Sequence, residues 1–192
     1  MNSSFIWLGF LPILAYVALD SFSGRITALW GALALGAAEL AFTLIRFKAL
    51  DYLSVVAFLM LAAFVALSLR TRNDFYFKIQ GALVNILSAF VLLGGWYLFH
   101  KALLLDMAVK YVGLDQLAAM NPALDKDMVA EMLRVLSLQL PWWLLLHSLF
   151  TIYAAANWSK WAWAFVRIPG FFVALFMAAN FAGAAAMHGA VK

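Results

Sequence analysis

The sequence has no cysteine among its 192 residues. A disulfide framework, a thiolate metal site and a cysteine nucleophile are therefore excluded. Charge is also scarce, because only 11% of the residues are Asp, Glu, Lys or Arg, whereas a soluble domain usually carries about a quarter. This shortage argues against a soluble globular domain.

The charges that are present favour the basic side, with 13 Lys and Arg against nine Asp and Glu. In a soluble protein this excess would suggest a nucleic-acid partner. No basic cluster longer than a loop occurs, so nucleic-acid binding is not expected. Basic residues in short loops that face anionic lipid explain the excess more simply.

Apolar residues make up 67% of the sequence, and the mean hydropathy is +0.96. They gather in blocks of about the length that crosses a hydrocarbon core as a helix. We predict an all-α fold, a polytopic membrane bundle of five to six transmembrane helices in a single integral membrane domain over residues 1–192. The six apolar segments are residues 5–19, 26–45, 52–69, 81–99, 141–158 and 171–187.

The first apolar segment is short for a span, contains Pro12 and is closed by Asp20. A proline is tolerated in a membrane helix, so we expect either a tilted span or a re-entrant piece. The residues before it lack a basic region, and no clear small-residue cleavage site follows. The segment from Phe5 onward is therefore interpreted as part of the mature protein rather than as a signal peptide.

A polar stretch over residues 101–139 separates the fourth and fifth apolar segments, and it carries five of the nine acidic residues. Its apolar residues recur at helical spacing in two stripes, which predicts an amphipathic helical hairpin. Asn121-Pro122 is a suitable start signal for the second helix. The hairpin either covers one end of the bundle or docks a partner protein.

Glu39 lies well inside the second apolar segment. A carboxylate at this depth is costly unless it faces a cavity, finds a partner or is protonated. Glu39 is therefore a candidate intramembrane polar site for a proton or a substrate. The competing interpretation is a buried acid hydrogen-bonded between helices, with Gly31 and Gly36 allowing neighbouring helices to approach closely.

No catalytic constellation, phosphate-binding loop or metal-ligand spacing occurs in the sequence. The three histidines are His100, His147 and His188, and no two of them are four residues apart on one helix. Haem ligation by His147 together with another span stays open as an alternative. We expect a protein that is not an enzyme, with no cofactor and no metal.

Several short motifs, taken in chain order, resemble the bacterial intracellular septation protein A family of inner-membrane proteins. The first half carries Phe10-Leu11-Pro12, Ile26-Thr27-Ala28-Leu29, Arg46-Phe47-Lys48 and Asn73-Asp74 with Lys78 four residues later. The second half fits more loosely, through Lys101 with Leu103-Leu104, residues 138–143 and Ile152-Tyr153. The chain departs from the family pattern at Ile79-Gln80-Gly81 and at Ala102, and residues 115–127 look inserted.

The resemblance implies a multi-pass protein of the bacterial inner membrane, with a non-enzymatic role in cell-envelope growth, septation and cell division. It implies contacts with other membrane proteins of the division or envelope-synthesis machinery. Arg46, Lys48, Asp74 and Lys78 are the matched polar positions, and they are candidates for structural or partner contacts.

Two other functions stay open from the residues. One is a small transporter or channel that uses Glu39 in a polar path, and the other is an accessory subunit of a larger membrane complex. A homo-oligomer is also open. The lipid bilayer is the one partner that the composition alone indicates.

Overall fold

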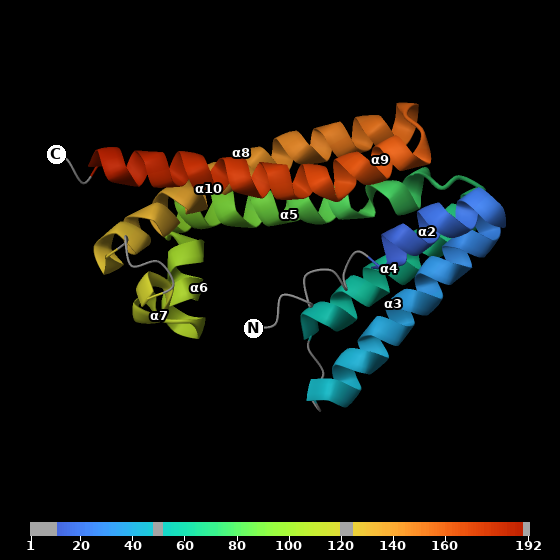
Figure 1. Ribbon diagram of the computed structural model, residues 1–192, viewed down its shortest axis with the longest axis horizontal. Helices are drawn as coiled ribbons and strands as arrows, with labels where there is room; N and C mark the ends of the chain where they lie inside the picture. Colours follow the sequence, from blue (N-terminus) through green and yellow to red (C-terminus); the bar gives the residue numbers. More distant parts are fainter. Residues whose placement is uncertain (1–10, 48–51, 120–124, 190–192) are drawn as a thin grey trace. The chain divides into compact units, whose positions relative to one another are not determined.

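The computed structural model describes residues 11–47, 52–119 and 125–189, and in this part of the chain the regular secondary structure is α-helical throughout (Figure 1). The helices are α2 (Leu11–Phe22), α3 (Arg25–Phe47), α4 (Tyr52–Thr71), α5 (Phe75–Phe99), α6 (Leu103–Tyr111), α7 (Leu114–Ala119), α8 (Lys126–Asn157), α9 (Lys160–Arg167) and α10 (Pro169–Gly189).

Among the described residues, four stretches of helix are long and apolar enough to cross a membrane: Arg25–Ile45, Phe75–Phe99, Lys126–Asn157 and Lys160–His188. They confirm the prediction of an all-helical, membrane-embedded protein. Two shorter apolar helices, Leu11–Phe22 and Val55–Thr71, account for the other predicted segments. The count of five to six spans stays a prediction.

The chain divides into two compact units. The first comprises Met1–Gly81 and Thr151–Ile168, and the second comprises Ala82–Phe150 and Pro169–Lys192. The first turns of α5 and the end of α8 therefore belong to the first unit, and the longer parts of both helices belong to the second. The single membrane domain expected from the sequence stays a prediction.

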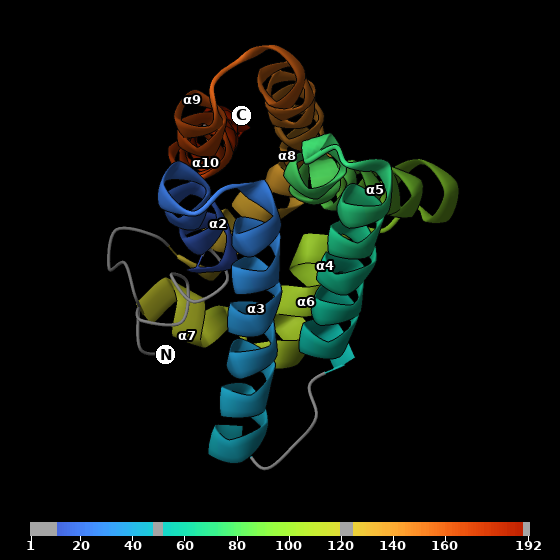
Figure 2. The same cartoon turned by 90° about the vertical axis from the view of Figure 1, so that its right-hand side faces the viewer.

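In the first unit, α2 packs against α3, and α3 packs against α4 (Figure 2). Gly24, with a φ of 81°, makes the sharp turn from α2 into α3, a conformation that glycine adopts without steric cost. A Cβ on Gly31 would lie 2.1 Å from Leu19 Cδ1, and one on Gly36 would lie 2.4 Å from Leu61 Cδ2. At these two glycines the neighbouring side chains therefore lie close to the backbone of α3.

The core of the first unit is aromatic. Tyr16 of α2, Phe77 of α5 and Trp163 of α9 are each at most 1% exposed. The Tyr16 and Phe77 ring centroids are 4.6 Å apart, and the Tyr16 and Trp163 rings meet edge to face at 6.2 Å. These contacts fix α9 against α2 and the start of α5, because large buried rings contribute both area and a preferred geometry.

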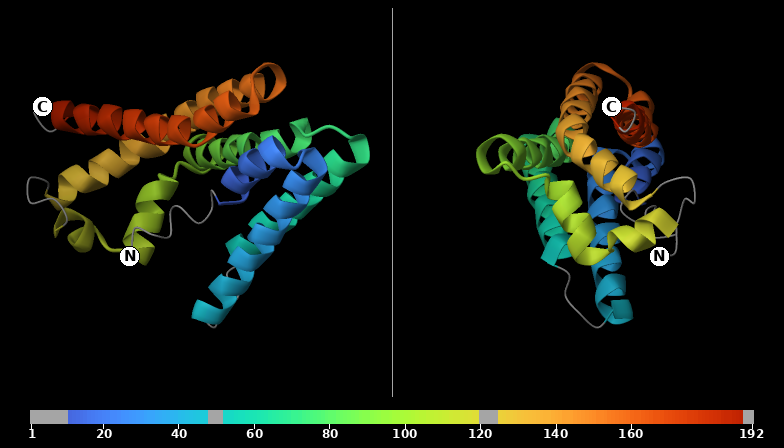
Figure 3. Two further views of the ribbon diagram at one scale, coloured as in Figure 1. Left: turned by 45° about the vertical axis from the view of Figure 1, so that its right-hand side comes forward. Right: turned by 90° about the vertical axis from the view of Figure 1, so that its left-hand side faces the viewer.

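In the second unit, α10 buries a row of small residues at four-residue intervals, Ala174, Ala178, Ala182 and Ala186. Small side chains on one face let membrane helices approach closely. In this unit, Trp143 of α8 stacks on Phe181 of α10 at 5.7 Å. Figure 3 shows α8 crossing α10 obliquely.

The polar insert differs from the prediction at one boundary. Gly113, with a φ of 87°, ends α6, and α7 follows it. The expected start at Asn121-Pro122 lies outside the described residues, and α8 begins at Lys126, where the Asp125 carboxylate accepts the Met128 N–H at 2.7 Å. α8 then continues for 32 residues through Pro141.

The second amphipathic stripe and the fifth apolar segment are therefore one helix, not two. The apolar pattern had placed the start of a separate segment at Pro141, where the composition changes from polar to apolar. In α8 this proline is buried and lies inside the helix, as membrane helices permit. The hairpin arrangement itself stays a prediction.

Candidate functional site

The turn between α4 and α5 carries the first candidate site. Arg72 adopts a φ of 52°, and the Asn73 N–H donates to the Ser68 carbonyl at 3.1 Å. Two side chains then satisfy N–H groups in the first turn of α5: Asn73 Oδ1 accepts from Phe75, and Ser68 Oγ accepts from Phe77, both at 2.9 Å. These bonds hold the turn rigidly and present Asp74 at the start of α5.

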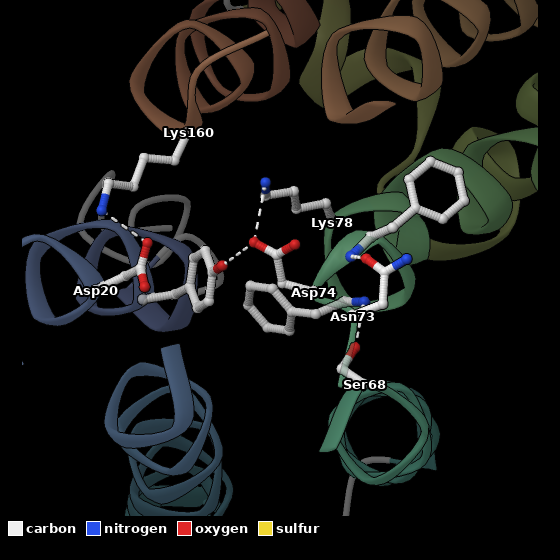
Figure 4. Close-up of polar contacts among 9 residues, drawn as sticks. Asp20, Ser68, Asn73, Asp74, Lys78 and Lys160 are labelled. Carbon is white, nitrogen blue, oxygen red and sulfur yellow. Dashed lines mark hydrogen bonds and ion pairs between the residues drawn. The ribbon is translucent and has the colours of Figure 1, made fainter. Parts of the chain in front are cut away.

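Asp74 and Lys78, the two matched residues of this turn, form an ion pair with Nζ 2.9 Å from Oδ2. The Tyr16 hydroxyl donates to the same Asp74 oxygen at 2.5 Å, which brings α2 into the pair (Figure 4). Only 24% of the Asp74 side chain and 10% of the Lys78 side chain are exposed. A charge so well covered requires its partner, so this arrangement is a structural joint.

The surroundings of Asp74 also set its pKa. Burial alone would raise the pKa of this carboxyl. The hydrogen bonds from Tyr16 and Lys78, together with the positive charge of Lys78, outweigh burial and hold the pKa below its ordinary value. Asp74 is therefore ionised at neutral pH.

A second ion pair joins α2 to α9 in the same unit. Lys160 Nζ lies 2.7 Å from Asp20 Oδ2 (Figure 4). From the sequence, Asp20 suggested a helix-end role with Arg25, and in the structure its ion-pair partner is instead Lys160, 140 positions away. Ser159 caps α9 by accepting the Ala162 N–H, which positions Lys160 at the start of the helix.

Arg167, at the end of α9, reaches the first turns of α5. Its Nη1 donates to the Lys78 carbonyl at 3.1 Å, and its guanidinium carbon lies 5.6 Å from the centre of the Trp163 ring. A Cβ on Gly81 would lie 2.6 Å from Arg167 Nη2, so the absence of a side chain there makes room for the guanidinium. Backbone and aromatic contacts thus hold Arg167 close to the Asp74–Lys78 pair.

The second candidate site is a pocket of about 170 Å³ inside the first unit. Glu39, Thr43, Gln80 and Arg167 supply its polar lining, and apolar residues of α2, α3, α4 and α5 supply the rest. The Thr43 hydroxyl donates to the Glu39 carbonyl at 2.9 Å. Within the described residues, no group hydrogen-bonds or pairs with the Glu39 carboxylate, so it is available to a proton, water or small cation.

The structure brings some predicted site residues together and separates others. Asp74 and Lys78 are paired, and Glu39 lies in the pocket with Arg167. Arg46 falls in the last turn of α3, and its side chain is outside the described part of the structure. Lys48 lies outside the described residues altogether.

His147 is buried in the second unit, where the Asn85 amide lies 3.3 Å from Nδ1 and the ring of Phe171 meets the imidazole at 5.8 Å. Among the described residues, no group of three or more His, Cys, Asp or Glu side chains could hold a metal ion. Asn85 and Phe171 together orient the imidazole within the helices.

Sequence reasoning missed Tyr16, Lys160 and Arg167 as members of the first unit's polar sites. Tyr16 sits in an apolar segment where a tyrosine passes as an ordinary core residue. Lys160 and Arg167 are the first and last residues of α9, a short amphipathic helix. This amphipathic pattern was the available signal that one face of α9 packs inward.

No protein-family model, curated protein or solved structure matches this chain. The fold and sites define its class as a helical membrane protein with an internal charge cluster and a small polar pocket. The resemblance to the septation family is carried by the motif residues alone, of which Asp74 and Lys78 are the best described.

Proposed function

We propose that this protein is a non-enzymatic, multi-pass protein of the bacterial inner membrane that acts in envelope growth and septation. It works through contacts with other membrane proteins. The proposal is supported by the membrane class and by the motif resemblance.

The Asp74–Lys78 joint is the observation that carries the proposal. These two matched residues are paired with each other and with Tyr16, and they hold α2 against α5. A role in shaping the fold accounts for why charged residues occupy this turn, with no reaction required. This is the behaviour expected of motif residues in a scaffold protein.

The polar insert supplies the surface for partner contacts. Met107 and Val109 of α6 are each 54% exposed, beside a segment rich in acidic side chains. The ion pairs of this region, Lys126 with Asp115 and Arg134 with Glu131, lie at the surface and add little stability. Exposed apolar residues next to surface charge are typical of a protein-binding surface.

The test is affinity purification from native membranes after mild crosslinking, with partners identified by mass spectrometry. The variant is Met107→Ser with Val109→Ser, and the control is Met187→Ser with Val173→Ser on α10, where exposure is 54% and 60%. We expect wall-synthesis or division proteins to be recovered with the wild type and the control but reduced at least fivefold with the variant.

Recovery of the protein alone, or only with itself, would contradict the scaffold proposal. Recovery of one partner in a fixed ratio, with poor stability in its absence, would favour the accessory-subunit alternative. Partner recovery that is equal in the variant and the control would remove α6 from the contact surface.

A second candidate function, transport, is favoured by the Glu39 pocket. An acidic side chain in an apolar helix, with no partner among the residues that the structure describes and with Gln80 and Arg167 in the same pocket, is a feature of proton and substrate paths. The test is proton flux into proteoliposomes, followed with a pH-sensitive dye. Transport predicts flux that Glu39→Gln abolishes and Glu131→Gln, in the exposed insert, preserves; unchanged flux in Glu39→Gln contradicts it.

A further inference from the structure

A second pocket, of about 450 Å³, lies in the second unit where α5 ends. Trp96, His100, Lys101, Asp106 and Arg134 line it. α5 is long and apolar enough to cross a membrane, so its last turn lies at the level where hydrocarbon gives way to headgroups. Trp96 is the kind of side chain that is enriched at this level.

The backbone around this pocket is held in place by specific contacts. The Lys101 N–H donates to the Gly95 carbonyl at 2.9 Å, and the Leu104 N–H donates to Ser137 Oγ of α8 at 3.2 Å. Gly95 has no room for a side chain, because a Cβ there would lie 2.5 Å from Leu103 Cδ1. α5, α6 and α8 are thus fixed around the pocket before any ligand enters.

His100 adopts a φ of 51° at the end of α5. Non-glycine residues seldom occupy this left-handed region, and such strain gathers at functional positions. The reversal at His100 turns the chain sharply, so that Lys101 returns toward α5 instead of continuing past it. A glycine would make the same turn at lower cost, but it would not bring an imidazole to the pocket.

The charges of the pocket match a phosphodiester. Lys101 is exposed and Arg134 has 57% of its side chain exposed, so both remain able to take an anionic ligand. Arg134 also contacts Glu131 at 3.0 Å, which orients the guanidinium. Arginine and lysine are the side chains that proteins use to bind phosphate, and their clusters beside membrane helices bind lipid headgroups.

We propose that this pocket binds the phosphodiester headgroup of a membrane lipid, with Lys101 and Arg134 contacting the phosphate and Trp96 contacting the upper acyl chains. Asp106 lines the same pocket and repels a second negative charge. The site is therefore suited to a headgroup with a single phosphate. The pocket includes Asp106 of α6 but neither Met107, Val109 nor Glu39, so lipid binding is tested separately from the septation and transport proposals.

The experiment is native mass spectrometry of the full chain in neutral detergent, titrated with phosphatidylglycerol, with phosphatidylcholine, or with inorganic phosphate alone. The variant is Lys101→Gln with Arg134→Gln. The control is Arg70→Gln with Arg72→Gln, which removes the same charge at the end of another apolar helix. All four side chains are exposed, and circular dichroism verifies that each protein remains folded.

We expect one phosphatidylglycerol to be retained by the wild type and by the control. The variant should bind it roughly tenfold more weakly or worse, since each basic residue near lipid contributes on the order of fivefold. Phosphatidylcholine should bind at the same position more weakly than phosphatidylglycerol, and Asp106→Asn should strengthen retention of the anionic lipid.

Two results would overturn the proposal directly: equal lipid binding in the variant and the wild type, or an equal loss in the control, which would indicate diffuse surface charge. Displacement of the lipid by millimolar inorganic phosphate would show that free phosphate is the occupant, and it would overturn the assignment to lipid. Retention of the lipid under the same phosphate challenge supports it.

Discussion

Two carboxylates of the first unit, Asp74 and Glu39, are in opposite situations. One carboxylate oxygen of Asp74 contacts both the Lys78 ammonium and the Tyr16 hydroxyl, and about three-quarters of the Asp74 side chain is buried. Glu39 lines a pocket and has no partner for its carboxylate among the described residues. The difference separates an acid that holds helices together from an acid that remains available for a ligand, although both are acidic residues amid apolar helices.

The largest expected effect comes from removing the partnered carboxylate. Asp74→Ala leaves the Lys78 ammonium covered and without its counter-charge, which costs about 3–5 kcal/mol for a buried pair. We expect that loss in the free energy of unfolding, measured by SDS titration with circular dichroism. Asp74→Leu with Lys78→Met, which removes both charges, should recover most of it; no recovery would show that the pair is not the source.

A smaller loss is expected from Tyr16→Phe. The ring contacts with Phe77 and Trp163 persist, and only the hydroxyl bond to Asp74 is removed, so the cost is about 2 kcal/mol for a hydrogen bond to a charged group. The same unfolding titration measures it. In the Asp74→Asn background the cost should fall below about 1 kcal/mol, and an undiminished cost would place the effect elsewhere.

Lowering the pH should gradually remove the stabilisation that ionised Asp74 gives to the folded protein. Because the folded-state pKa of Asp74 is depressed, its stabilisation is present above the ordinary pKa of 3.8 and is lost as the pH falls through the lower folded-state value. The stability difference between wild type and Asp74→Asn should therefore be constant from pH 7 to about pH 5 and shrink below about pH 4. A difference that grows in acid would contradict the assignment.

The smallest effect is expected at Glu39. Glu39→Gln keeps the shape of the side chain and breaks no described contact of the carboxylate, so stability should change by less than about 0.5 kcal/mol. This result beside a large loss in Asp74→Ala would confirm the contrast between the two acids. A loss above about 2 kcal/mol would instead make Glu39 a structural residue.

Features that depend on local sequence were the ones that could be predicted. Apolar blocks of span length predicted the helices. The i, i+4 spacing of Asp74 and Lys78 was a local signal that the two side chains share a face, and the depth of Glu39 in the membrane stays a prediction. The Asp20–Lys160 pair was not readable, because its members are 140 positions apart and many other pairings of charges are equally compatible with the sequence.

The pocket around Glu39 could not be predicted for a related reason. Its lining comes from α2, α3, α4, α5 and α9, and its volume depends on how their side chains fill the space between them. The continuity of α8 was missed because the change from amphipathic to apolar composition near Pro141 does not coincide with a helix end.

The 32-residue length of α8 has a mechanical consequence. At about 1.5 Å of rise per residue the helix extends about 48 Å, which exceeds the hydrocarbon thickness of about 30 Å. A helix of this length that crosses the hydrocarbon therefore leaves roughly three turns, at about 5.4 Å each, beyond the acyl chains, and the same helix carries His147. Pro141, which lacks a backbone donor, lies inside α8 and is the position at which this long helix is least restrained by its own hydrogen bonds.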